Sequence, residues 1–328
     1  MGLIRLGKPL LPFATSAVAL AWLGSTLDLS PLRGALQRIR WDLLPAVAAV
    51  LVALVGVFAW RWRLLLGGHQ GWRACAVATA VGLGANQVLP ARGGDLLRTL
   101  YSARWASVSL HRSLSALVVE KLLDLAAAGA IGALALALVA AGTADVATRR
   151  LAGLTSLAVV GGSLAAMLML RSGGAHRVLR AVVRALRLGR GLYWHAYRPL
   201  FHLRRALLAR ALAAPLALTL AMWLSLYAYA FELIPRVVGI ELSWREAVAV
   251  LFAASLGLAI PAAPSGVGTF HAAVISGFLI IGRSPAEGLV AATIVHAAFF
   301  AGFGLCGLAA LPFAPHRART AGPMGTIE

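Results

Sequence analysis

Long uncharged runs recur along this 328-residue chain and constrain its fold more than any other feature. A helix needs about 20 mostly apolar residues to cross about 30 Å of hydrocarbon, and these runs approach or exceed that length. They are Leu10–Leu27, Leu43–Trp60, Ala74–Ala91, Leu125–Ala144, Leu151–Leu170, Ala211–Phe231, Ala247–Gly282 and Gly288–Pro315. The seventh run is too long for one span and contains prolines, so we read it as two helical pieces around a break. The sequence therefore predicts an all-α, polytopic integral membrane bundle of about eight spanning helices with two broken or re-entrant segments.

The composition supports a membrane environment. Hydrophobic residues make up 60% of the chain and charged residues 12%, which leaves too little polar surface to cover a soluble protein. A net charge of +19 would suggest nucleic-acid binding in a soluble protein, but the arginines lie between apolar runs rather than on one folded face. Both cysteines fall within apolar runs, so no disulfide framework or metal cluster is indicated. We expect membrane lipids as partners, no nucleic acid and no cofactor.

The basic residues predict the orientation. The stretch 171–210 holds ten arginines and no acid, which marks it as cytoplasmic by the positive-inside rule. Counting spans from it places both termini and the Arg61–Arg73 loop on the cytoplasmic side of a bacterial-type inner membrane, provided that Ala74–Ala91 is re-entrant. The alternative is an ordinary crossing, which would place Arg98 and Arg104 outside.

We expect one transmembrane domain over residues 1–311, containing the basic cytoplasmic loop 171–210, and a disordered cytoplasmic tail over residues 312–328. The basic loop has two interpretations. Arg177, Arg180, Arg184 and Arg187 recur at helical spacing, as in an interfacial amphipathic helix that binds anionic head groups. Alternatively, the loop is a topology signal only.

A first break interrupts the third apolar run. Asn86 and neighbouring glycines weaken the helix, Pro90 ends it, and Gly93 begins a new one. Non-helical backbone at membrane depth persists only where it is buried in protein or lines a wet cavity. We therefore expect a substrate path at this break.

Charged residues follow the break at intervals of three. Arg92, Asp95 and Arg98 would share one face of a helix with a net positive charge. Such a face beside helix-start amides suits an anionic phosphate. The alternative is an ion-pair cluster at the membrane surface that only positions a helix.

Two acids and a lysine form a second charged group within a long helical run. Glu120 and Asp124 are four residues apart on one face and repel each other unless a cation or a proton intervenes. Lys121 has the spacing to reach Asp124, and Arg92 or Arg98 could supply another cation. Intramembrane ionisable residues are costly and indicate function, although a salt-bridge cluster that locks two helices is the alternative.

A second break lies in the seventh run. Pro261 and Pro264, followed by Gly266 and Gly268, cannot continue a helix between apolar flanks. Paired interruptions in the two halves of a membrane protein point to a transport site at a repeat interface. The turn after Pro264 leads into a new helix whose free amides could face an anion.

Together these strings resemble the transmembrane-domain family of lysylphosphatidylglycerol synthases, also called flippase-like membrane proteins. The resemblance rests on the string from Asn86 to Arg98, the Glu120–Asp124 string about 22 residues later, and the Pro261–Gly268 string near the end. Order, spacing and topology cover nearly the whole chain.

The sequence departs from the family pattern at four positions. The family more often has glutamate at the position of Asp95, arginine at Lys121, glycine at Ser265 and glutamate at His271. The first two differences preserve charge, whereas the last removes an acid. Family members that make lysyl-lipid also carry a large soluble aminoacyl-transfer domain, and this chain ends 17 residues after residue 311, where the predicted transmembrane domain ends. We therefore do not expect synthase activity.

The resemblance implies lipid translocation, or an accessory role in handling an aminoacylated, glycosylated or hopanoid-type lipid. The alternatives are a membrane-embedded glycosyl or group transferase accessory and a non-catalytic assembly partner in lipid biosynthesis. We expect no catalytic residue and no metal ligand. The residues expected to bind or gate an anionic lipid are Asn86, Pro90, Arg92, Gly93, Asp95, Arg98, Glu120, Lys121, Asp124, Pro261, Pro264, Gly266 and Gly268.

Overall fold

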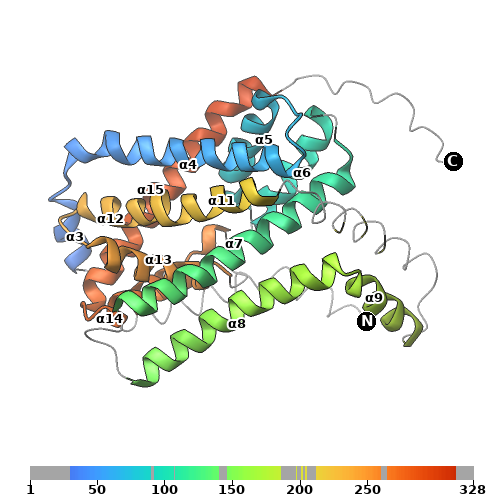
Figure 1. Ribbon diagram of the computed structural model, residues 1–328. Helices are drawn as coiled ribbons and strands as arrows, with labels where there is room; N and C mark the ends of the chain where they lie inside the picture. The colour runs from blue at the N-terminus through green and yellow to red at the C-terminus, as the bar shows by residue number, and fades with distance from the viewer. Residues whose placement is uncertain are drawn as a thin grey trace, which may run out of the picture.

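The computed structural model describes residues 30–89, 92–106, 108–139, 146–185, 212–259 and 264–314, together with residues 197, 201 and 204. Every secondary-structure element in these ranges is a helix (Figure 1), so the predicted all-α class is confirmed for the described part of the chain. Three predicted segments lie wholly or largely outside the described residues. They are the first span, the part of the basic loop after residue 185 and the tail after residue 314.

Three helical segments among the described residues are long and apolar enough to cross a membrane. They consist of η1 with α4, α11 with η4 and α12, and α15 with η6. The bounds of these elements are Trp41–Leu43, Leu44–Leu65, Ala213–Ala221, Met222–Tyr227, Ala228–Arg236, Pro285–Ala310 and Leu311–Phe313. A short α3 (Ser30–Leu36) precedes the first segment. The expected total of about eight spans stays a prediction.

The longest described helix is α7 (Leu110–Val139), which has 30 residues and is therefore about 45 Å long. It packs against α8 (Val146–Arg171), and α9 (Gly174–Ala185) continues from the end of α8 at an angle (Figure 1). The N-terminal half of α7 carries Glu120, Lys121 and Asp124 into the bundle, where α4 and α6 also contact it.

The first break separates α5 (Trp72–Val88) from α6 (Gly93–Trp105), close to the predicted position. At 17 and 13 residues, these helices are about 26 and 20 Å long, shorter than the hydrocarbon layer. They pack so tightly that a Cβ added to Gly94 would lie 2.1 Å from the carbonyl oxygen of Gly82. Only glycine allows this approach, which brings the start of α6 against α5. Whether the pair re-enters on one side of the membrane stays a prediction.

The second break lies between α13 (Trp244–Ala259) and α14 (Thr269–Ile280), with the short η5 (Pro264–Gly266) between them. Helix α14 packs against both α13 and α15, and the three helices form the central apolar core together with α4 and α12. The contact of η5 with α5 brings the second break beside the helix that leads into the first. The two interruptions are therefore neighbours in space.

Candidate functional site

Arg61 lies inside the bundle rather than in a basic loop, because α4 continues past the predicted end of its span to Leu65. Its side chain is 0% exposed and faces α7 and α11. The Nη1 atom lies 2.5 Å from Oδ1 of Asp124 and donates a hydrogen bond of 3.1 Å to Oγ1 of Thr219. The prediction that Arg61 belongs to a loop is therefore wrong, because α4 continues through it, whereas the side of the membrane on which this end of α4 lies stays a prediction.

A second buried ion pair joins α6 to α7. The Nη2 atom of Arg98 lies 2.6 Å from Oε1 of Glu120, and both side chains are almost completely buried, at 2% and 1% exposure. The same Glu120 oxygen is 3.6 Å from Nη2 of Arg61. Oε2 of Glu120 has no hydrogen-bond partner among the described residues. Glu120 thus lies within ion-pairing distance of two guanidinium groups and of the Lys121 ammonium, while its Oε2 accepts no hydrogen bond in the described part of the chain.

The indole ring of Trp62 packs against the guanidinium of Arg98. The guanidinium carbon of Arg98 lies 4.1 Å from the ring centroid of Trp62, a distance at which the ring attracts the cation. The indole Nε1 donates a 2.8 Å hydrogen bond to the hydroxyl of Ser102 on α6. Trp62 therefore fixes α6 to α4 and holds the Arg98 guanidinium toward Glu120.

Asp95 is held between both helices of the first break and α7. The amide nitrogen of Asp95 donates to Oδ1 of Asn86, and Nδ2 of Asn86 donates to Oδ1 of Asp95, at 3.2 and 3.1 Å. Lys121 places its Nζ 2.7 Å from Oδ2 of Asp95. Lys121 therefore pairs with Asp95 rather than with Asp124, which the sequence spacing had suggested. Asp124 instead pairs with Arg61 and accepts a 3.4 Å bond from Nε1 of Trp223.

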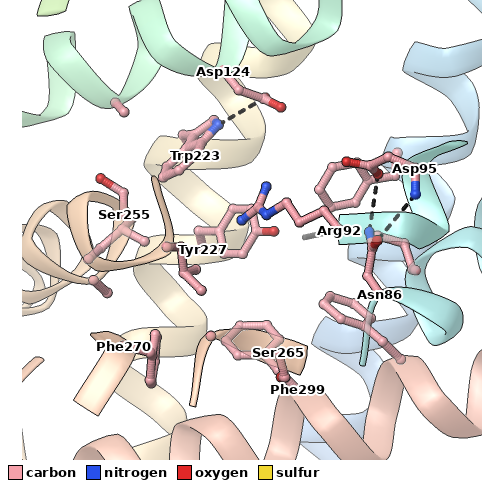
Figure 2. A pocket seen from close by; sticks show the side chains of 18 of the residues that line it. Asn86, Arg92, Asp95, Asp124, Trp223, Tyr227, Ser255, Ser265, Phe270 and Phe299 are labelled. Atoms are coloured by element: carbon pink, nitrogen blue, oxygen red, sulfur yellow. Dashed lines mark hydrogen bonds between the residues drawn. The ribbon is translucent and has the colours of Figure 1, made fainter. Parts of the chain in front are cut away.

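Arg92 stands apart from these pairs. It is the residue before α6 and has a left-handed backbone with φ of 56°, so it does not share the helical face of Asp95 and Arg98. Its side chain extends into the cavity toward Tyr227 (Figure 2). Among the described residues, no carboxylate lies within ion-pairing distance of Arg92. The break therefore supplies an arginine that forms no ion pair of its own with an acid of the described residues.

The charge balance of the site is positive. Four cations, Arg61, Arg92, Arg98 and Lys121, face three acids, Asp95, Glu120 and Asp124, which leaves a formal charge of +1. Each acid has at least one cation within 2.7 Å, so the excess resides on Arg92.

A cavity of about 510 Å³ connects this network to an apolar wall. One end is charged, and the remainder is lined mainly by hydrophobic and aromatic side chains from α4, α12, α13, α14, α15 and the π-helical segment η4. The aromatic members are Phe58, Trp223, Tyr227, Phe231, Phe270, Phe299 and Phe303. Cavities of this size accommodate small ligands or the polar part of a larger one.

The π-helical segment η4 contributes Met222, Trp223 and Tyr227 to the cavity. A π turn widens a helix and turns its side chains relative to a regular α-helix, and such turns are frequent at functional sites. The apolar pattern of the run Ala211–Phe231 contains no signal for this change in winding, so sequence reasoning missed these three residues.

The second break meets the first through one hydrogen bond. The hydroxyl of Ser265 donates to Oε1 of Gln87 at 2.9 Å, and both residues line the cavity. Ser265 has φ of 61°, an unusual backbone for a residue with a side chain. Gly266 also lines the cavity, whereas Gly268 immediately precedes α14. Both breaks therefore place a left-handed residue at the same cavity.

Two histidines lie on the apolar side of the cavity. The rings of His271 and His296 are stacked with centroids 5.1 Å apart, and Phe270 packs against both. Of the two histidines, His296 lines the cavity. No group of three or more His, Cys, Asp or Glu side chains suited to a metal ion occurs in the described ranges.

The structure gathers most of the residues predicted from sequence into one place. The cavity is lined by Asn86, Arg92, Asp95, Arg98, Glu120, Lys121, Asp124 and Gly266. Gly93 begins α6 without lining the cavity, and Pro90 and Pro261 lie outside the described residues, as does the side chain of Pro264. Arg61 and Trp62 were missed, although the apolar residues after them could have shown that the helix continues.

Comparison with models of known protein families identifies a family for this chain. The model of the family described as Lysylphosphatidylglycerol synthase TM region matches residues 10–307. No curated protein and no solved structure matches the chain.

Proposed function

The chain belongs to the lysylphosphatidylglycerol synthase TM region family, and on this premise we propose that it is a flippase-like lipid translocator of the membrane. The observation that carries the proposal is the cavity at the two helix breaks, which is charged at one end and aromatic over the rest. An amphiphile has the same division between a polar head and an apolar body. The cavity therefore suits part of a lipid better than a small, wholly polar solute.

Arg92 is the group that we assign to the lipid head group. A phosphate oxygen near its guanidinium would receive a charge-assisted hydrogen bond and would neutralise the excess charge of the site. Aminoacylated and glycosylated phospholipids and anionic hopanoid-type lipids share this head-group chemistry, so the proposal covers all three. The aromatic residues Trp223, Tyr227 and Phe299 would contact the part of the lipid below the phosphate.

The buried pairs have a different role in this proposal. Arg61–Asp124 and Arg98–Glu120 link α4, α6 and α7 around the charged end of the cavity. Charges buried this deeply are stable only while each has its partner, because an unpaired one is strongly destabilising. We assign them to holding the helices in register and gating the passage of the head group.

We place the charged end of the cavity toward the cytoplasm of a bacterial-type inner membrane. Basic residues cluster at this end of the molecule, on α9, in the last turn of α4 (Arg63) and in the first turn of α5 (Arg73). Such clusters favour the cytoplasmic side. The expected cytoplasmic location of both termini follows from the same rule.

Lipid movement between leaflets tests the proposal. Purified protein in liposomes that contain NBD-labelled phosphatidylglycerol should accelerate the loss of fluorescence that dithionite causes when inner-leaflet lipid reaches the surface. The Arg92→Gln variant should be about ten-fold slower or more, because a hydrogen bond to a charged group contributes about 1.5–3 kcal/mol. Arg104→Gln is the matched control, since Arg104 is exposed on α6 and does not line the cavity.

The same experiment separates the alternatives. A non-catalytic assembly partner would give the rate of empty liposomes for the unmodified protein and for both variants. A translocator that does not use the cavity would show equal rates for Arg92→Gln and Arg104→Gln. Either outcome, with labelled anionic and glycosylated lipids both tried, contradicts the proposal. Loss in Arg92→Gln alone supports it.

A further inference from the structure

Helix α9 (Gly174–Ala185) has a basic face that the proposed translocation does not use. Arg177, Arg180 and Arg184 are spaced by three and four residues, so they lie on one side of the helix. All three are exposed, and no acidic side chain in the described part of the chain pairs with them. The helix itself contains no acid. This face therefore carries a charge of about +3 that its surroundings do not compensate.

The adjacent side of α9 is apolar and only partly covered. Val178 is 50% exposed, whereas Ala175 is buried and Leu179 is half-buried. A strongly amphipathic helix with an arginine face and an exposed aliphatic edge has the pattern of a helix that lies in a membrane interface. A purely topological signal would require the arginines but not this separation of polar and apolar faces.

The attachment of α9 fixes where this surface lies. Ala175 at the start of α9 and Leu170 at the end of α8 pack in one buried cluster with Val119 and Leu123 of α7. Leu65 at the end of α4 packs against the same cluster. The helix is therefore anchored at the end of α4, beside the turn of α7 that carries the buried acids, where a membrane span meets the lipid head groups.

We propose that α9 binds the anionic lipid surface of the leaflet next to the charged end of the cavity. Its three arginines contact anionic head groups, and the edge at Val178 enters the interface. Charge complementarity determines the occupant, since each basic residue near an anionic surface contributes about five-fold to binding. This binding does not depend on lipid translocation, so it extends beyond the proposed function.

The proposal predicts the depth of α9 in a bilayer, which a fluorophore at Val178→Cys reports. A Cys306→Ala background leaves this thiol as the reactive one, because the other cysteine of the chain, Cys75, is fully buried. The measurement is how strongly brominated phosphatidylcholine quenches this fluorophore in vesicles with and without phosphatidylglycerol. We expect at least about two-fold stronger quenching with phosphatidylglycerol, and loss of the difference in 1 M salt, where the screening length falls to about 3 Å.

Three variants test the assignment. The triple change Arg177→Gln, Arg180→Gln and Arg184→Gln should reduce the quenching to the level of neutral vesicles. The corresponding triple lysine variant should retain it, because a lipid surface responds to charge rather than to guanidinium geometry.

The matched control is Arg33→Gln, Arg38→Gln and Arg245→Gln. It removes the same charge from exposed positions near the opposite end of α4. At that end the amide of Arg40 donates a hydrogen bond to the carbonyl of Val237, which brings the segment before α13 close to the start of α4. We expect quenching at Val178 to be unchanged in this control. Equal quenching in neutral vesicles, loss in the lysine variant or loss in the control would overturn the proposal. Since no lipid needs to cross the bilayer, these outcomes are independent of whether the protein translocates lipid.

Discussion

The guanidinium of Arg61 lies 2.5 Å from the carboxylate of Asp124, and the arginine is completely buried between α4 and α7. The two residues are 63 positions apart in the chain. Their contact makes the charged end of the cavity an internal part of the bundle.

This pair gives a first prediction about stability. Asp124→Asn should destabilise the protein by about 3 kcal/mol, because the completely buried Arg61 loses its nearest carboxylate and keeps only Glu120 at 3.6 Å. Arg61→Gln should cost less, because the Asp124 side chain that it leaves behind is 21% exposed. Replacing both by hydrophobic residues, as in Arg61→Met with Asp124→Leu, should recover most of the loss. Thermal unfolding in detergent measures the effect. The exposed pair Arg40–Asp42 is the control, and its removal should leave the melting temperature almost unchanged, because water screens an exposed ion pair.

A second prediction concerns the support of Arg98. Ser102→Ala removes the hydrogen bond of the Trp62 indole and should cost about 1 kcal/mol. Trp62→Leu removes that bond, the ring under Arg98 and buried area, and should cost about 3–5 kcal/mol. Unfolding of the two variants measures the difference. Similar losses in both would mean that the ring contributes little beyond its hydrogen bond.

A third prediction concerns the close approach of α5 and α6. Gly94→Ala should destabilise the protein by about 3 kcal/mol or more, because the new Cβ meets backbone atoms of Gly82 and Asn86 that cannot move independently. Gly56→Ala is the opposite case. Gly56 lies in α4 with open space around it, so alanine should stabilise the helix by up to about 1 kcal/mol. Thermal melts of both variants provide the comparison, and a harmless Gly94→Ala would contradict the packing described here.

A fourth prediction concerns the bond that joins the two breaks. Ser265→Ala keeps the left-handed backbone and loses the bond to Gln87, so it should cost about 1–2 kcal/mol. Ser265→Gly also loses the bond but relieves the backbone cost, which leaves stability within about 1 kcal/mol of the original protein. Lipid translocation and unfolding should both be measured. If glycine were the more damaging substitution, the left-handed backbone would not be a source of strain.

A fifth prediction concerns pH at the other end of the bundle, where Glu246 precedes the apolar part of α13. Partial burial favours a higher pKa for Glu246, but hydrogen bonds from Ser243 and the ion pair with Arg283 outweigh it and hold this pKa below its usual value of 4.5. Because the folded pKa is lowered, the stabilisation is present above pH 4.5 and is lost as the pH falls below it. The difference in melting temperature between the original protein and Glu246→Gln should therefore shrink between pH 6 and pH 3.5. A constant difference would contradict the assignment.

Much of the fold could be predicted from local pattern. The end of α5 near Pro90, the start of α6 at Gly93 and the interruption after α13 follow from proline and glycine chemistry, which acts within a few residues. The π turn at Trp223 and Tyr227 could not be predicted, because the apolar residues 216–231 contain no proline, glycine or change of period that marks it.

The candidate site was predicted as a set of residues but not as a set of pairs. The spacing suggested that Lys121 reaches Asp124, whereas Lys121 contacts Asp95 and Asp124 contacts Arg61. Side chains at three or four positions along one helix are near one another, but a partner on a neighbouring helix can be nearer still. The spacing rule therefore gives candidates and does not choose between them.

By itself, the sequence determined that the chain is a helical membrane protein of this family with polar interruptions, because hydropathy, proline and glycine act locally and are visible in the order of residues. Only the tertiary structure decided that Arg61 is internal, that Arg92 alone among the site cations lacks an acid within ion-pairing distance in the described part of the chain, and that both breaks open on one cavity. The reason is physical: the cost of a buried charge depends on its distance to charges elsewhere in the fold, and those distances exist only after the helices have packed.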